Sequence, residues 1–163
     1  MQRKRRDIQG LRAVAVLAVV INHLTGHPAG GFVGVDVFFV ISGYLITGIL
    51  LRDLGAGLGP LAYVAAFYRR RIRRILPAAV LVIALTLLAA HELFNPSRYA
   101  NTRTDGWWAL IFGANWHLID VKTNYFTAGG PVSPLQHYWS LAVEEQFYLV
   151  WPVLIFLVVL APG

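Results

Sequence analysis

Four long apolar stretches constrain the fold of this chain more than any other feature of its sequence. They are residues 11–28, 32–51, 75–93 and 139–160. A helix needs about 20 predominantly apolar residues to cross the hydrocarbon core of a bilayer, and each stretch approaches this length. Only 13% of the 163 residues are charged, whereas soluble domains average about 25%. We therefore expect an all-α fold, a polytopic transmembrane helical bundle with about four spans, forming a single membrane domain over residues 1–163.

The basic residues predict how these spans are oriented. Eleven of the 14 lysines and arginines lie in residues 3–12 and 52–74, beside the apolar stretches. Segments rich in lysine and arginine stay on the cytoplasmic side of a membrane. We expect a multi-pass protein of the plasma (inner) membrane with a cytoplasmic N-terminus. The same placement accounts for the net charge of +6 without a nucleic-acid partner.

The segment between the third and fourth spans is expected outside the cell. Within it, Gly106–Ile119 is apolar and carries three tryptophans, but it is only about 14 residues long, too short for a regular span. It is predicted to form an interfacial or re-entrant helix, and counting it as a span gives a five-span alternative. Pro77 is expected in the first turn of the third span, where its missing N–H is tolerated. Tyr138 and Tyr148 are interpreted as interface anchors.

Three ionisable residues interrupt the apolar stretches. His23, Asp36 and Glu144 each lie about five residues from the expected outer end of a span, so we expect them roughly 7 to 8 Å below the outer interface. Arg12 precedes His23 by eleven residues, which places both on nearly one helix face, about 16 Å apart. Ionisable side chains at such depth are costly unless they face a polar cavity or a partner, so these residues are candidate functional residues.

Several kinds of site are excluded by composition. The chain has no cysteine, so it has no disulfide, zinc–thiolate site, iron–sulfur cluster or cysteine nucleophile. No spacing of histidines and carboxylates predicts a metal site, and there is no glycine-rich phosphate loop. We expect no metal and no permanently bound cofactor.

Four segments of the sequence resemble the membrane-bound acyltransferase family 3. They are RDIQGLRAVAVLAVVINHL, GGFVGVDVFFVISGYLIT, FYRRRIRRILP and LQHYWSLAVEEQFYLVWP, in this order across most of the chain. The family O-acetylates lipopolysaccharide, other surface polysaccharides and some small glycosylated molecules. Its domain has about ten spans, so the resemblance implies that this chain is the N-terminal part of a larger domain, with a C-terminal half or a second chain as a partner.

The family's motifs fall on particular residues of this sequence. Its arginine–histidine motif matches Arg12 and His23, its R-x-x-R motif matches Arg71 and Arg74, and its glutamate after W-S-L matches Glu144. The resemblance implies an acyl-CoA donor at the cytoplasmic face, a carbohydrate or glycolipid acceptor at the outer side, and transfer within the bilayer.

These matches suggest a division of roles. His23 is the expected base, since neutral imidazole suits this task near pH 7, with Asp36 and Glu144 as its partners. Arg12, Arg71 and Arg74 are expected to bind the phosphates of coenzyme A.

Glu144 is preferred to its neighbour Glu145. Adjacent residues lie about 100° apart on a helix, and we expect that they cannot both face one site squarely. Direct transfer to the acceptor and transfer through an acyl-histidine are both open at this point.

Two other classes of protein fit part of the pattern. Histidine, aspartate and glutamate at one depth also suit a transporter or proton-relay protein, although the cytoplasmic arginine pairs favour an anionic donor. The chain could also be an inactive acyltransferase fragment.

Overall fold

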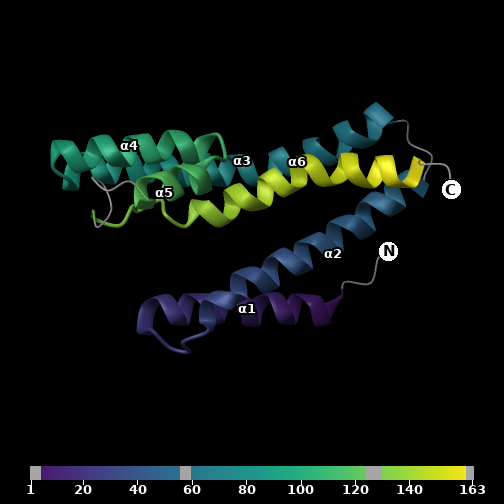
Figure 1. Cartoon of the computed structure of the whole chain (residues 1–163), viewed down its shortest axis with the longest axis horizontal. Coiled ribbons are helices and arrows are strands. Elements are labelled where there is room, and N and C mark those ends of the chain that lie inside the picture. Colours follow the sequence, from purple (N-terminus) through teal and green to yellow (C-terminus); the bar gives the residue numbers. More distant parts are fainter. Residues whose placement is uncertain (1–4, 56–59, 124–129, 161–163) are drawn as a thin grey trace. The chain divides into compact units, whose positions relative to one another are not determined.

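The computed structural model describes residues 5–55, 60–123 and 130–160, and this part of the chain is helical with no strand (Figure 1). Its helices in chain order are α1 (Arg6–Thr25), the short 3-10 helix η1 (Gly31–Val33), α2 (Gly34–Gly55), α3 (Pro60–Leu93), α4 (Pro96–Leu110), α5 (Ala114–Thr123) and α6 (Tyr138–Leu160). Four candidate spans, Arg6–Thr25, Gly31–Gly55, Ala62–Leu93 and Tyr138–Val159, are long and apolar enough to cross a membrane. The all-α class and the four expected spans are confirmed.

The third span begins earlier than expected. The basic segment before it and the apolar segment after it form one helix, α3, which has 34 residues and contains Pro77 in its interior. The expectation that Pro77 lies in a first turn is therefore wrong. Proline removes one helical hydrogen bond, a defect that helices in membranes tolerate when neighbouring groups compensate. At about 51 Å, α3 exceeds the roughly 30 Å hydrocarbon core.

The predicted interfacial helix over Gly106–Ile119 is divided in two. Helix α4 ends at Leu110, Phe112 adopts a left-handed backbone conformation with φ of 54°, and α5 begins at Ala114. Gly113 permits this junction to close, because a Cβ atom there would lie 2.8 Å from Cε3 of Trp108. Neither half is among the four candidate spans of the described residues, so the five-span alternative is not supported.

The chain divides into two compact units, residues 1–57 and 58–163. In the first, glycines bring α2 and η1 against α1. A Cβ atom on Gly34 would lie 2.8 Å from Cγ2 of Val19 and would also collide with the carbonyl oxygen of Ala15. Gly34 is thus a point of close approach, whereas a Cβ atom on Gly48 of the same helix would meet nothing within 4 Å.

The second unit is built on an antiparallel pair, α3 and α6. The rings of Tyr63 and Phe156 lie 6.0 Å apart, and the Tyr68 hydroxyl donates a hydrogen bond of 2.6 Å to the Leu149 carbonyl. Residue numbers thus rise along one helix as they fall along the other. Helix α6 consequently lies beside the first part of α3.

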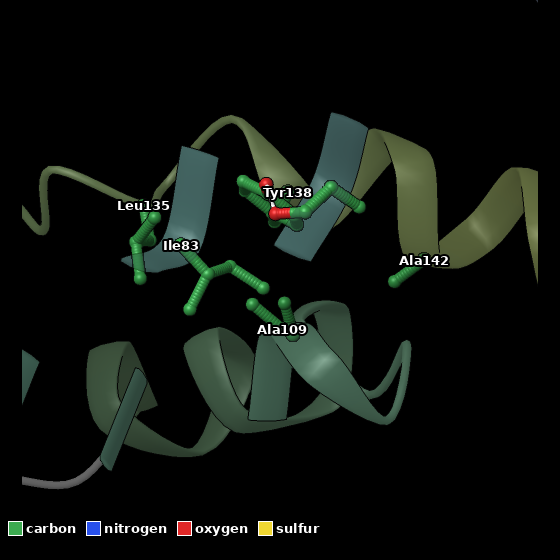
Figure 2. Packing of buried hydrophobic residues seen from close by; sticks show 7 residues of the cluster. Ile83, Ala109, Leu135, Tyr138 and Ala142 are labelled. Atoms are coloured by element: carbon green, nitrogen blue, oxygen red, sulfur yellow. Dashed lines mark hydrogen bonds between the residues drawn. The ribbon is translucent and has the colours of Figure 1, made fainter. Parts of the chain in front are cut away.

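Helices α4 and α5 complete this unit. The later part of α3 packs against α4, and a small apolar core joins all four helices around Tyr138 (Figure 2). The core residues are Ala79, Ile83, Ala109, Ala114, Leu135, Tyr138 and Ala142. Tyr138, expected as an interface anchor, is only 3% exposed, and this expectation is wrong.

Replacing Tyr138 with phenylalanine should lower the stability of this core. Its hydroxyl donates a buried hydrogen bond of 2.7 Å to the Ala79 carbonyl, and losing such a bond costs about 0.5–1.5 kcal/mol. The measurement is thermal unfolding of the detergent-solubilised chain. Tyr99→Phe is the control, because the ring of Tyr99 contacts His91 edge-on and keeps that contact. Equal melting temperatures for the two variants would contradict the assignment.

Candidate functional site

His23 lies in the last turn of α1, where its own backbone defines which ring nitrogen carries a proton. Nδ1 is 2.8 Å from the carbonyl oxygen of Val19. A carbonyl oxygen can only accept, so in this hydrogen bond Nδ1 carries the hydrogen and the neutral ring keeps its lone pair on Nε2. The side chain is exposed. His23 is therefore in the tautomer that can take a proton through Nε2.

The turn after α1 fixes the position of His23. Gly26 has a left-handed φ of 74° and its N–H bonds the Asn22 carbonyl at 2.8 Å, which ends the helix. The Asn22 side chain donates a hydrogen bond of 2.8 Å to the Pro28 carbonyl. The structure makes Asn22 a positioning residue for this turn.

Asp36 and Arg12 lie in the same unit as His23. Asp36 is exposed in the first turn of α2, and His23 and Asp36 form no hydrogen bond with each other in the described residues. The guanidinium carbon of Arg12 lies 5.4 Å from the centre of the Phe38 ring, a cation–π distance. His23 is two residues from the end of α1, nearer than the expected five.

In the second unit, Arg71 of α3 meets two glutamates of α6. Its Nη2 lies 3.0 Å from Oε1 of Glu145 and 3.9 Å from Oε1 of Glu144, and its Nε lies 3.3 Å from Glu145. The two adjacent glutamates reach this one guanidinium unequally, Glu145 at the shorter distance and Glu144 at the longer. Both side chains are long and flexible enough to reach one guanidinium.

This contact also corrects the expected depths. Arg71 was placed at the cytoplasmic face and Glu144 near the outer face. Because Arg71 bonds Glu145 at 3.0 Å, the arginine and both glutamates share one level of the α3–α6 pair. The three side chains are partly buried, with exposed fractions of 16% for Arg71, 27% for Glu144 and 17% for Glu145.

Tyr148 contacts both Arg71 and Glu144 and is therefore part of this group. The guanidinium carbon of Arg71 stands 3.3 Å from the centre of the Tyr148 ring, and the tyrosine hydroxyl donates a hydrogen bond to Oε1 of Glu144. Tyr148 is 2% exposed, so its interpretation as an interface anchor is wrong. The missed signal was its spacing: residues four apart share a helix face.

Gln146, the third polar residue in succession, binds a different partner. Its side-chain nitrogen donates hydrogen bonds to the Phe112 carbonyl at 2.8 Å and to Oδ1 of Asn115 at 2.9 Å. Gln146 therefore holds the junction between α4 and α5 against α6. The sequence signal was a polar residue in an apolar helix, but its partner could not be read from it.

The two arginines of the R-x-x-R motif differ in their surroundings. Arg71 is directed to α6, whereas Arg74 is exposed, as are its neighbours Arg69 and Arg73. Of the pair, Arg74 is the one whose side chain is open to a solute.

Another contact that sequence reasoning missed joins α4 to α5. His117 Nε2 lies 2.9 Å from Oδ1 of Asp105, and the imidazole stacks on Trp108 with 5.5 Å between ring centres. In the described residues, no three histidines or carboxylates are grouped so that they could hold a metal ion.

Comparison with known proteins identifies the family. The model of a family described as an acyltransferase domain matches residues 5–163. This chain belongs to that acyltransferase family. The matched region includes all six candidate residues, and the resemblance inferred from the four sequence segments is confirmed.

Relatives within the family are considerably longer. The chain is 48% identical over 153 residues to YrhL of Bacillus subtilis, covering 93% of this chain and 23% of YrhL. It is 44% identical over 154 residues to the peptidoglycan O-acetyltransferase OatA of Listeria monocytogenes, covering 93% and 24%. It is 39% identical over 149 residues to the O-acetyltransferase OatA of Staphylococcus aureus, covering 91% and 24%.

The chain thus spans about a quarter of the length of the curated relatives it matches. No solved structure matches it.

Proposed function

We propose that this chain is the N-terminal part of a membrane O-acyltransferase that moves an acetyl or other acyl group to a carbohydrate hydroxyl. The observation that carries this proposal is the tautomer of His23 in a member of this family: Nδ1 donates to Val19, so Nε2 can take a proton. A relative named peptidoglycan O-acetyltransferase favours a cell-wall glycan as acceptor. Lipopolysaccharide presents the same hydroxyl chemistry.

The proposed reaction is a proton transfer coupled to nucleophilic attack. Nε2 of His23 takes the proton of the sugar hydroxyl while the hydroxyl oxygen bonds to the acyl carbonyl carbon. The bond from that carbon to the donor's leaving group then breaks, and the leaving group takes the proton from the imidazolium. Asp36, which belongs to the same compact unit as His23, is proposed to stabilise the transient positive charge on the imidazole. Glu144 is proposed as a second carboxylate of the reaction.

We propose acyl-CoA as the donor, with Arg12 and Arg74 each as a contact for its phosphates. Guanidinium groups bind phosphate oxygens in pairs, and the exposure of Arg74 supports its role. Arg71 was expected to share this task. Because its guanidinium is held by Glu145 and Tyr148, we assign it a different role below.

Changing Arg74 to glutamine is expected to raise KM for acetyl-CoA about tenfold with little change in kcat, since hydrogen bonds to charged groups contribute about 1.5–3 kcal/mol. Arg73→Gln is the matched control, because Arg73 is the exposed neighbour of Arg74. Arg73 is proposed only to help set the orientation of the chain in the membrane. The measurement is the initial rate of transfer against donor concentration. Similar KM values for both variants would remove Arg74 from the donor site.

The N-terminus is proposed to lie in the cytoplasm. Because the chain has no cysteine, single introduced cysteines report their side of the membrane without background. In intact cells, an impermeant thiol reagent should label Ser97→Cys, in the first turn of α4, and should leave Arg52→Cys, near the end of α2, unlabelled. Labelling of Arg52→Cys alone would reverse the proposed orientation.

The experiment that tests the function is transfer of radiolabelled acetyl from acetyl-CoA to peptidoglycan fragments in membranes that contain this chain. Labelled glycan above the level of membranes without the chain is the expected result. Labelling from another acetyl donor alone would retain the transferase and overturn the donor. Proton flux in liposomes with no acetyl transfer would instead indicate a transporter.

A further inference from the structure

Arg71 contacts the two glutamates of its cluster unequally. The cluster consists of Arg71, Glu144, Glu145 and Tyr148. Arg71 approaches Glu145 through two nitrogens, at 3.0 and 3.3 Å, and Glu144 through one, at 3.9 Å. Glu144 accepts the Tyr148 hydroxyl instead. One positive charge therefore faces two carboxylates, and its stronger contact is with Glu145.

We propose that Arg71 and Glu145 form an ion-pair clamp that, together with Tyr148, positions Glu144 as the carboxylate presented to the reaction. The inference rests on the proposed function and deepens it. It makes Arg71, Glu145 and Tyr148 positioning residues, and it keeps the substrate-facing role for Glu144 alone.

Exposure supports this division. Glu144 is the most accessible of the three charged side chains, at 27%, against 17% for Glu145 and 16% for Arg71. The charge of Glu145 is already matched by the closely paired guanidinium of Arg71, so we assign Glu145 to positioning. The more open carboxylate is the one that a substrate group can reach.

The geometry of Arg71 suits a clamp. Its guanidinium is planar, so it can stack on the Tyr148 ring and still direct its N–H groups in its plane towards Glu145. Tyr148 stands four residues after Glu144 on the same helix face, which keeps its hydroxyl beside that carboxylate. One arginine thus orients two neighbouring side chains of α6.

Contacts on both sides keep the clamp in register. The hydroxyl of Tyr68 in α3 bonds the Leu149 carbonyl of α6, and that of Tyr138 in α6 bonds the Ala79 carbonyl of α3. A slide of either helix by one residue would break both bonds. The level of Arg71 relative to the glutamates is consequently fixed by the packing of the pair.

Chemical labelling tests the division without requiring transfer activity. Dicyclohexylcarbodiimide enters membranes and adds covalently to protonated carboxyl groups, and mass spectrometry of the labelled chain locates the adduct. Arg71→Gln should raise labelling of Glu145 above its level in the unaltered chain, because this carboxylate then loses its ion-pair partner. Labelling of Glu145 that does not rise in Arg71→Gln would overturn the proposal.

Charge exchange tests the clamp itself. Arg71→Glu and Glu145→Arg should each lower the melting temperature of the solubilised chain, and the double exchange should recover most of the loss. Arg73→Glu is the control for added negative charge at an exposed site of α3. If the double exchange lowered the melting temperature by as much as the two single exchanges added together, the two residues would not be coupled.

If the unaltered chain transfers acetyl, the kinetics of its variants separate positioning residues from the catalytic carboxylate. Glu144→Gln should reduce kcat more than any positioning variant does, because it removes the one carboxylate that faces the reaction, and Tyr148→Phe should reduce kcat about tenfold without changing KM for the donor, since one hydrogen bond is lost. Glu145→Gln reducing kcat more than Glu144→Gln would overturn the proposal. Absence of transfer by the unaltered chain would indicate an inactive acyltransferase fragment instead of an active enzyme, and the labelling and charge exchange would still decide the clamp.

Discussion

Replacing His23 with alanine is expected to reduce acyl transfer by at least about a hundredfold, the lower end of what a general base contributes. The physical reason is the tautomer: Nδ1 is held by the Val19 carbonyl, so the proton can go only to Nε2. The side chain is exposed, so its removal should leave α1 folded. The measurement is acetyl transfer by membranes with equal amounts of each variant.

The control for this variant is His27→Ala. His27 is also exposed and lies in the turn that follows the same helix, so a loss of activity from altered surface or insertion would affect both variants. His23→Gln gives a second control, because glutamine keeps a polar side chain without a base of suitable pKa. Retention of more than a tenth of the transfer in His23→Ala would exclude His23 as the base.

Replacing Gly34 with alanine should destabilise the first unit by about 1–3 kcal/mol, the usual cost of overpacking. The added methyl group would lie 2.8 Å from Cγ2 of Val19, with the carbonyl oxygen of Ala15 still nearer. Because one of these neighbours is backbone, no rotamer change can relieve the clash, and α2 must move away from α1. The measurement is thermal unfolding in detergent.

The matched control for Gly34 is Gly48→Ala in the same helix. A methyl group at Gly48 would meet nothing within 4 Å, so this change should stabilise α2 by up to about 1 kcal/mol through helix propensity. The two identical substitutions are thus expected to have opposite signs. If both raised the melting temperature, the close contact of α1 with Gly34 would be refuted.

A shift of the crossing between α1 and α2 would also disturb the turn that holds His23. Gly31, which precedes Gly34 by less than one helical turn, lies against Ala18 and Asn22 of α1. We therefore expect Gly34→Ala to lower transfer activity together with stability, whereas His23→Ala lowers activity alone.

Local sequence patterns were sufficient to predict the candidate spans and the family of this protein. The length of each apolar stretch predicted the four candidate spans, since crossing a bilayer depends on length and composition and on no particular partner. Residue spacing similarly placed Arg12 and His23 on one helix, and the motifs carried the family. These properties are local, so they survive any arrangement of the helices.

The sequence reading failed where a property depends on a neighbouring helix. It placed Pro77 at a helix start, joined α4 to α5 across Gly113, and assigned Tyr148 to the membrane interface. In each case the residue type was interpreted by its average behaviour, whereas packing decided the outcome: a helix continues through proline when its surroundings support it.

By itself, the sequence determined the helical class, the candidate spans, the family and the identity of the ionisable residues. Only the tertiary structure decided that Arg71 meets Glu145, that Tyr148 supports Glu144, and that Gln146 holds the α4–α5 junction. The physical reason is register. Hydropathy and periodicity describe one helix at a time, but the partner of a side chain depends on how far α3 and α6 are shifted along each other, which the packing of their whole contact surface sets.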